Sequence, residues 1–298
     1  MAAQGESPAV ARRRVRLALR KAREATGLSQ SAVADRVGWS MSKVQRIESG
    51  DVSVSGTDLR ALLDLYGVTD AEEVEQLSEE ARISRRQRWW TVAEYRRHLT
   101  PAYAQLLQFE AEATAVRSYQ TVLIPGVLQT PAYAQAVIGS YDESLTADER
   151  RVRFDARMQR RRQFLESERA SSHYVILDES ILDRVIGGFE VMAEQFGDVA
   201  RVARTPGVHI RIVPLTEGAI LGQLGPFLLL DLGGDDDPDD AVLYRESFTR
   251  DSIEHSAAEI TFHRRMFEKL WRRSLDEEKT VRALEATAAQ LRTRADRQ

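Results

Sequence analysis

Residues 27–50 read GLSQSAVADRVGWSMSKVQRIESG, and this stretch decides how the N-terminal part of the chain folds. It predicts two short helices joined by a tight turn. Ser29 and Ser40 are placed to cap the two helices, since a serine hydroxyl accepts hydrogen bonds from the free N–H groups of a first helical turn. Gly38 permits the turn because glycine adopts a positive φ without a Cβ clash. The residues whose spacing turns them inward are Val33, Ala34, Val37, Val44 and Ile47.

The charge of this region separates it from the rest of the chain. Residues 10–50 hold ten basic and three acidic side chains, a net charge of +7, whereas the whole chain carries −4. A basic module on an acidic protein is typical of a DNA-binding protein. An ordinary helical hairpin would explain the apolar spacing alone, but not its combination with caps, turn and charge. The stretch is therefore interpreted as a helix-turn-helix, which lays its second helix in the major groove.

Residues 12–68 resemble the phage-repressor type of helix-turn-helix domain, the XRE family. The resemblance implies that Gln30 positions a phosphate at the start of one helix. Many relatives have glutamine where this chain has Met41, so the base preference of those relatives is not transferred. Lys43 and Arg46 are expected either to read guanine or to hold phosphates. The predicted DNA-binding residues are Gln30, Ser40, Met41, Ser42, Lys43, Gln45 and Arg46.

Domain boundaries follow from the same patterns. Residues 1–11 are expected to be a flexible N-terminus, and residues 12–78 to form the helix-turn-helix domain. Residues 79–100 are expected to be a basic aromatic linker or helix, in which Trp89 and Trp90 pack on the second domain. The remaining helices of the first domain are indicated by an apolar stripe of Leu59, Leu62, Leu63 and Tyr66, and by Val74 and Leu77.

Residues 101–298 predict an α+β domain with a small mixed sheet flanked by helices. The fold class is thus multi-domain, with an all-α helix-turn-helix domain first. A Thr-Ala-Asp-Glu capping box at residues 146–149 starts one helix, and the apolar run at 227–232 is expected to be a central strand. The other predicted helices are 101–119, 130–138, 188–204, 254–271 and 276–292, and the other predicted strands are 173–177, 208–213 and 241–246.

Several linked strings of this second half resemble one family. They are QRWW, FEAEA, LIPGVLQTPAYAQAV (123–137), RRQFL, DESILDRVIGG (178–188) and GPFLLLDL (225–232). They are similar to the actinobacterial, antitoxin-like XRE regulators of the WhiJ type. The resemblance implies a DNA-binding regulator of development or secondary metabolism, often encoded beside a small partner protein. It implies no chemistry for the C-terminal domain.

Residues 150–162 form an arginine-rich helix, with seven arginines against one aspartate. Adjacent arginines point around the whole helix, so some must lie near the core or an interface. Three roles compete for them: a second DNA contact, a pocket for an anionic signal, and docking of an acidic partner or of the other domain. Docking is the favoured interpretation.

No catalytic, metal or cofactor site is predicted. The chain has no cysteine, which excludes disulfides, thiolate zinc sites and cysteine nucleophiles. The two strand histidines lack a nucleophile at a recognisable spacing, and the helical pair lacks an acidic residue that would complete a metal site. Acidic clusters at 178–183 and 235–240 are better explained as a helix cap and a solvated loop. The four histidines in question are His173, His209, His255 and His263.

The sequence therefore predicts a sequence-specific transcriptional regulator that binds double-stranded DNA. We expect a homodimer whose C-terminal domain receives a small protein or a small molecule. We also expect a cytoplasmic protein without membrane contact, because no apolar run approaches ~20 residues and no signal peptide is present. Two alternatives stay open: an antitoxin-like protein that neutralises a small partner and controls its own operon, and an enzyme tethered to DNA.

Overall fold

The structure is a computed structural model that describes residues 8–50, 52–85, 93–141, 145–166, 171–217, 225–233, 238–246 and 251–297. The chain divides into two compact units, Met1–Val92 (unit 1) and Ala93–Gln298 (unit 2). Trp89, Trp90 and residues 235–237 of the acidic loop lie outside the described residues. The predictions made for them therefore stay predictions.

Unit 1 is a helical bundle, as the sequence predicts. Its helices are α1 (Pro8–Ala25), α2 (Gln30–Val37), α3 (Met41–Glu48), α4 (Gly56–Tyr66) and α5 (Ala71–Ser84). The hydroxyls of Ser29 and Ser40 accept hydrogen bonds from the third residue of α2 and of α3 respectively, and Gly38 adopts φ 68° between the two helices. Helix α5 continues past residue 78 because Ala81 is buried in the core of unit 1.

Unit 2 is an α+β domain built on a six-stranded mixed sheet. Its helices are α6 (Ala93–His98), α7 (Pro101–Glu112), α8 (Pro131–Tyr141), α9 (Ala147–Leu165), α10 (Phe189–Val202), α11 (Ala257–Arg273) and α12 (Glu277–Ala295). Its strands are β1 (Ala115–Gln120), β2 (Ser172–Asp178), β3 (Val208–Val213), β4 (Phe227–Asp231), β5 (Ala241–Arg245) and β6 (Ser252–Glu254). The strand order is β3-β2-β1-β4-β5-β6. Strand β1 runs parallel to β2 and antiparallel to β4, so β4 is central as predicted.

The prediction of one helix over residues 101–119 is wrong. Helix α7 ends at Glu112, and β1 begins three residues later. Strand β1 hydrogen-bonds to a neighbour on each side, so strand pairing with distant residues overrides the local helical composition. The short edge strand β6 was also not predicted.

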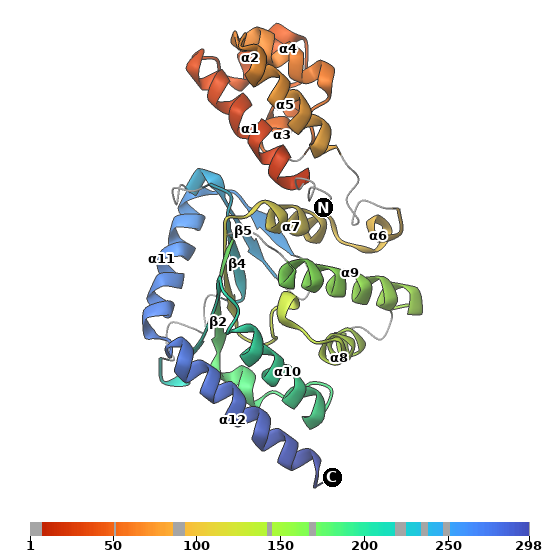
Figure 1. Cartoon of the computed structure of the whole chain (residues 1–298), viewed down its shortest axis with the longest axis vertical. Helices are drawn as coiled ribbons and strands as arrows, with labels where there is room; N and C mark the ends of the chain where they lie inside the picture. Colours follow the sequence, from red (N-terminus) through yellow and green to blue (C-terminus); the bar gives the residue numbers. More distant parts are fainter. Residues whose placement is uncertain are drawn as a thin grey trace. The chain divides into compact units, whose positions relative to one another are not determined.

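Helices cover both faces of the sheet (Figure 1). Helix α11 covers one face, where its Phe267 packs with Tyr119 of β1 and Phe227 of β4. The other face carries α7 over β4 and β5, and α10 with α12 over β2 and β3. At the end of β4, the buried carboxylate of Asp231 pairs with both Arg117 of β1 and Arg264 of α11. This carboxylate therefore ties the central strands to the covering helix.

Candidate nucleic-acid interface

Helix α3 presents one buried and one exposed face. Val44 and Ile47 are buried in the core of unit 1, as predicted. On the opposite side, Ser42, Gln45 and Arg46 are exposed, and Met41 keeps 49% of its surface in solvent. An exposed methionine at the first turn of such a helix contributes an apolar contact surface, suited to a thymine methyl group.

Lys43 does not point freely outward with its neighbours. Its Nζ lies 2.9 Å from Oδ1 of Asp58 on α4 and 3.7 Å from the centroid of the Trp39 ring. The side chain of Lys43 is 39% exposed, and its ammonium group is held there by a carboxylate and an aromatic face, both of which attract a cation. The local sequence pattern gives no sign of the Asp58 contact, since Asp58 is fifteen residues away from Lys43.

A buried ionic cluster holds the helix-turn-helix together. Glu48, at the end of α3, accepts hydrogen bonds from Nε of Arg23 at 2.7 Å and from Nε2 of Gln30 at 2.8 Å. Arg23 also donates to the carbonyl oxygen of Leu28 at 2.8 Å. The cluster thus joins α1, α2 and α3. The side-chain amide of Gln30 therefore points inward to Glu48. Gln30 is nevertheless the first residue of α2, the position predicted for a phosphate contact.

The cluster also has an electrostatic signature. The hydrogen bond to Glu48 raises the pKa of the Arg23 guanidinium above its usual value. Burial, together with the nearby Glu48 charge, raises the pKa of the Tyr66 hydroxyl to about 12. Arg16 is likewise turned inward, where its Nη1 donates to the carbonyl oxygen of Ser49 at 3.1 Å. Part of the basic charge of residues 10–50 therefore fixes the fold instead of facing a ligand.

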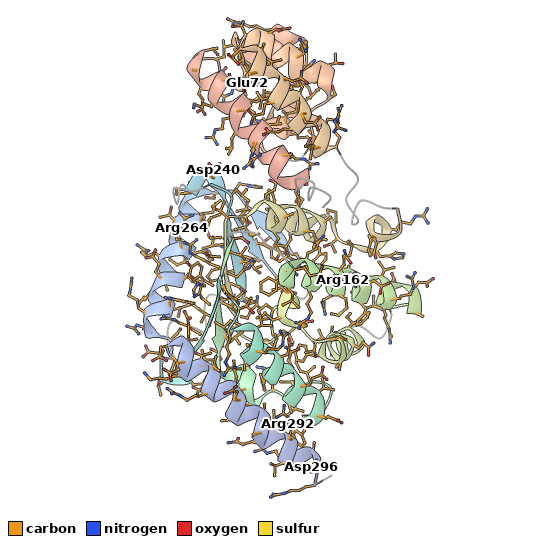
Figure 2. All side chains as sticks on the ribbon, viewed as in Figure 1. Glu72, Arg162, Asp240, Arg264, Arg292 and Asp296 are labelled. Carbon is orange, nitrogen blue, oxygen red and sulfur yellow. The ribbon has the colours of Figure 1, made fainter. Side chains whose placement is uncertain are left out.

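The arginines of α9 are likewise divided between structure and surface. Arg160 makes two parallel hydrogen bonds to Glu110 of α7, at 2.6 and 2.5 Å. Arg161 pairs with Asp198 of α10 at 2.5 Å. Both arginines are buried, so they anchor α9 to neighbouring helices of unit 2. Arg162, on the same helix, is exposed (Figure 2).

The histidines considered as catalytic candidates make packing contacts. His173 meets the ring of Phe164 edge-on, and burial lowers its pKa to about 4. His209 stacks on Tyr174 and lies 3.1 Å from Glu277. His263 donates to the carbonyl oxygen of Glu259 at 2.8 Å. Within the described ranges, no three His, Asp or Glu side chains come together in a way that would hold a metal ion.

Two family matches cover most of the chain. Residues 14–77 match a helix-turn-helix domain, which supports assigning unit 1 to DNA binding. Residues 103–286, more than half of the chain, match a family described as a domain of unknown function (DUF5753). No curated protein and no solved structure matches the chain. In the part of the chain that the structure describes, no helix has the length and apolar character needed to cross a bilayer. The chain therefore belongs to the DUF5753 family and carries a helix-turn-helix domain ahead of the region that defines it.

Proposed function

We propose that this protein is a sequence-specific transcriptional regulator of the XRE, WhiJ-like type. In this proposal α3 enters the major groove, and unit 2 supplies dimerisation and receives a protein or small-molecule signal. The observation that carries the proposal is the exposed row on α3, formed by Met41, Ser42, Gln45 and Arg46. The buried Glu48 cluster supports it, because base recognition needs a helix held in a fixed orientation.

The residues of the exposed row differ in the base edges that they can recognise. Arg46 has the chemistry to make two hydrogen bonds to guanine O6 and N7. Gln45 suits an adenine edge, and Met41 suits a thymine methyl group. Lys43 plays a smaller part in this scheme, since Asp58 already neutralises its charge.

A selection experiment tests this function. The full chain is used to select duplexes from a random pool, and fluorescence anisotropy then compares a selected duplex with a scrambled one. Arg46→Ala should weaken binding to the selected duplex by about 1–3 kcal/mol and leave the scrambled duplex much less affected. An equal loss on both duplexes would make Arg46 a phosphate contact. Failure to enrich any duplex at low salt would refute the proposal.

Arg82→Ala is the matched control for this experiment. Arg82 is an exposed arginine of unit 1, but it lies on α5 and pairs with Glu79 of the same helix. Its replacement removes the same charge from the same unit. Because Arg82 lies outside the exposed row of α3, duplex binding should change little. Lys43→Ala should cost less than Arg46→Ala on the selected duplex.

The proposed dimer has a geometric test of its own. Two recognition helices related by a two-fold axis contact half-sites about 34 Å apart, one duplex turn. A footprint with two protected half-sites at that spacing, together with a dimer mass by light scattering, is the expected result. A monomer protecting a single half-site would contradict it. A small protein that copurifies from the native host and abolishes duplex binding would instead favour the antitoxin-like function.

A further inference from the structure

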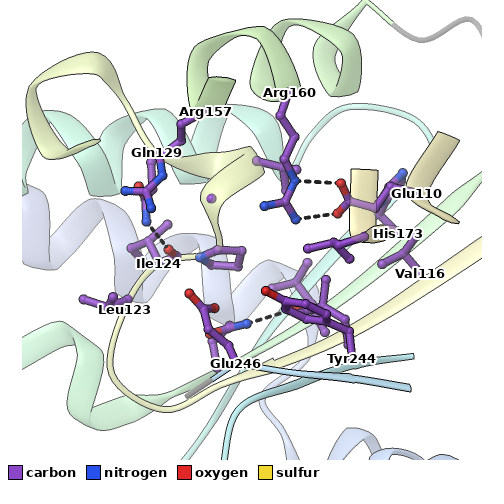
Figure 3. A pocket seen from close by; sticks show the side chains of 18 of the residues that line it. Glu110, Val116, Leu123, Ile124, Gln129, Arg157, Arg160, His173, Tyr244 and Glu246 are labelled. Carbon is purple, nitrogen blue, oxygen red and sulfur yellow. Dashed lines mark hydrogen bonds and ion pairs between the residues drawn. The ribbon is translucent and has the colours of Figure 1, made fainter. Parts of the chain in front are cut away.

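Unit 2 contains a pocket over one face of its sheet, beneath α7 and α9 (Figure 3). Its floor is one row of paired residues: Ser118 of β1 lies between Val175 of β2 and Leu228 of β4, and Leu228 pairs with Tyr244 of β5. The floor therefore spans the four central strands. It includes the point between β1 and β4 where the strand order reverses, and ligands of α/β sheets often bind at such a point.

The segment after β1 forms one wall and is held rigidly. Gln129 donates through Nε2 to the carbonyl oxygen of Ile124 at 2.7 Å. The hydroxyl of Tyr133 accepts from the N–H of Ile124, and the fully buried Gln195 of α10 bonds to both Leu128 and Thr130. The wall is thus fixed before any ligand arrives, which lowers the entropy cost of binding.

Two polar groups in the pocket have unused hydrogen-bonding capacity. Gln129 is 3% exposed, and its Oε1 has no hydrogen-bond partner among the described residues. Nη1 of Arg157 is also buried and, within the same ranges, has none. Both side chains line the pocket and lie on the same side of it (Figure 3). A buried donor and a buried acceptor left open in this way are costly unless a ligand or water satisfies them.

The charges of the lining indicate what the ligand must carry. Arg160 is neutralised by its two bonds to Glu110, so it contributes little net charge. Arg157 remains as a cation that favours a carboxylate. Glu246 also lines the pocket, where burial and the nearby Asp251 charge raise the pKa of its carboxyl. A ligand with a carboxylate for Arg157 and a hydrogen-bond donor for Oε1 of Gln129 therefore satisfies both open groups.

The size and apolar lining restrict the ligand further. The cavity measures about 50 Å³, and a single water needs at least ~10–15 Å³ on this measure. It therefore has room for roughly three to five water-sized groups, which restricts the ligand to a very small molecule. The remaining lining is largely aliphatic and includes Leu106, Leu123 and Val127.

We propose that this pocket binds a small aliphatic amino acid. Its carboxylate pairs with Arg157, its ammonium group donates to Oε1 of Gln129, and its side chain contacts the aliphatic lining. The assignment of this amino acid as the signal received by unit 2 rests on the proposed function. Binding itself does not depend on that function.

Calorimetric titration of the full chain with alanine tests the site. Propionate, which lacks the ammonium group, and alaninamide, which lacks the carboxylate, are the matched probes. Alanine should bind saturably, and each probe should bind at least about tenfold more weakly, since each loses a charge-assisted hydrogen bond. No saturable alanine binding, or equal affinity for alanine and alaninamide, would overturn the proposal and leave the pocket to water.

Variants locate the binding in the pocket. Arg157→Gln should weaken alanine binding by about tenfold or more and erase the preference over alaninamide. The control Arg162→Gln removes an exposed arginine of the same helix and should leave alanine binding unchanged. Gln129→Leu should weaken alanine far more than propionate, and this variant decides the matter if Arg157→Gln does not fold. Unchanged binding in either pocket variant would overturn the proposal.

Duplex binding by the same samples separates the two proposals. If alanine binds but no duplex is selected, the amino-acid site stands and the regulatory function fails. If a duplex is selected but alanine does not bind, the function stands and the site fails.

Discussion

The buried cluster around Glu48 makes the stability of unit 1 depend on one carboxylate. The Glu48 side chain is 5% exposed and its partner Arg23 is 12% exposed. Glu48→Leu roughly keeps the side-chain volume but removes the buried carboxylate nearest to the Arg23 guanidinium, leaving the more exposed Glu24 at 3.5 Å. Loss of one partner of such a pair costs about 3–5 kcal/mol. For a domain of this size each 1 kcal/mol lowers the melting temperature by roughly 4–8 °C, so unit 1 should melt at least about 12 °C lower.

Calorimetry and hydrogen exchange of the α2 and α3 amides measure this effect. A double variant, Arg23→Met with Glu48→Leu, should recover most of the loss, since a well-packed apolar pair replaces a buried ion pair at little cost. Glu79→Leu is the control, because it breaks the exposed Arg82–Glu79 pair of α5 and should cost at most about 1 kcal/mol. The reasoning is refuted if Glu48→Leu costs no more than this control, or if the double variant is as unstable as the single one.

Two further predictions concern unit 2. Gly187 adopts φ 76°, and a Cβ there would lie 2.7 Å from Cβ of Ala136. Gly187→Ala should therefore lower the free energy of unfolding, measured by urea denaturation, by more than about 2 kcal/mol. Adding Ala136→Gly should restore part of this lost stability, and no restoration would contradict the clash. Burial lowers the pKa of His173 to about 4 in the folded protein. Between pH 4 and 6.5 the unfolded chain therefore binds more protons than the folded protein. The stability that neutral His173 contributes is complete above this window and is lost as the pH falls through it. The free energy of unfolding should therefore drop by about 2 kcal/mol from pH 7 to 5, and His173→Phe should remove this drop; an equal drop in the variant would assign it to other groups.

Features set by neighbouring residues were predictable from the sequence. The serine caps of α2 and α3 depend on contacts three residues apart, and so does the Thr146–Glu149 capping box of α9. The inner and outer faces of α3 also follow from helical spacing. Each of these features is a local consequence of backbone geometry, which is why the pattern identified them.

Features set by distant residues were not predictable. Lys43 pairs with Asp58, fifteen residues away, and β1 is a strand because β2 and β4 pair with it. The pocket draws its lining from α7, α9, four strands and the segment after β1. Gln129 carries no signal of its own in the sequence, whereas Arg157 belongs to the arginine-rich stretch 150–162, for which a pocket for an anionic signal is one of the three predicted roles. Only the packing shows that they share a cavity in which Oε1 of Gln129 and Nη1 of Arg157 have no hydrogen-bond partner among the described residues.

The place of β1 in the sheet bears on how the chain is made. This strand leaves the ribosome before either of its neighbours, and its contact with β4 joins residues more than a hundred positions apart, as in the pairing of Ala115 with Asp231. Both edges of the nascent strand therefore stay unpaired during much of synthesis, a state open to aggregation. Such long-range pairing also makes closure of the sheet a slow step. A nascent chain halted before β4 should thus be the form of this protein that depends most on chaperones.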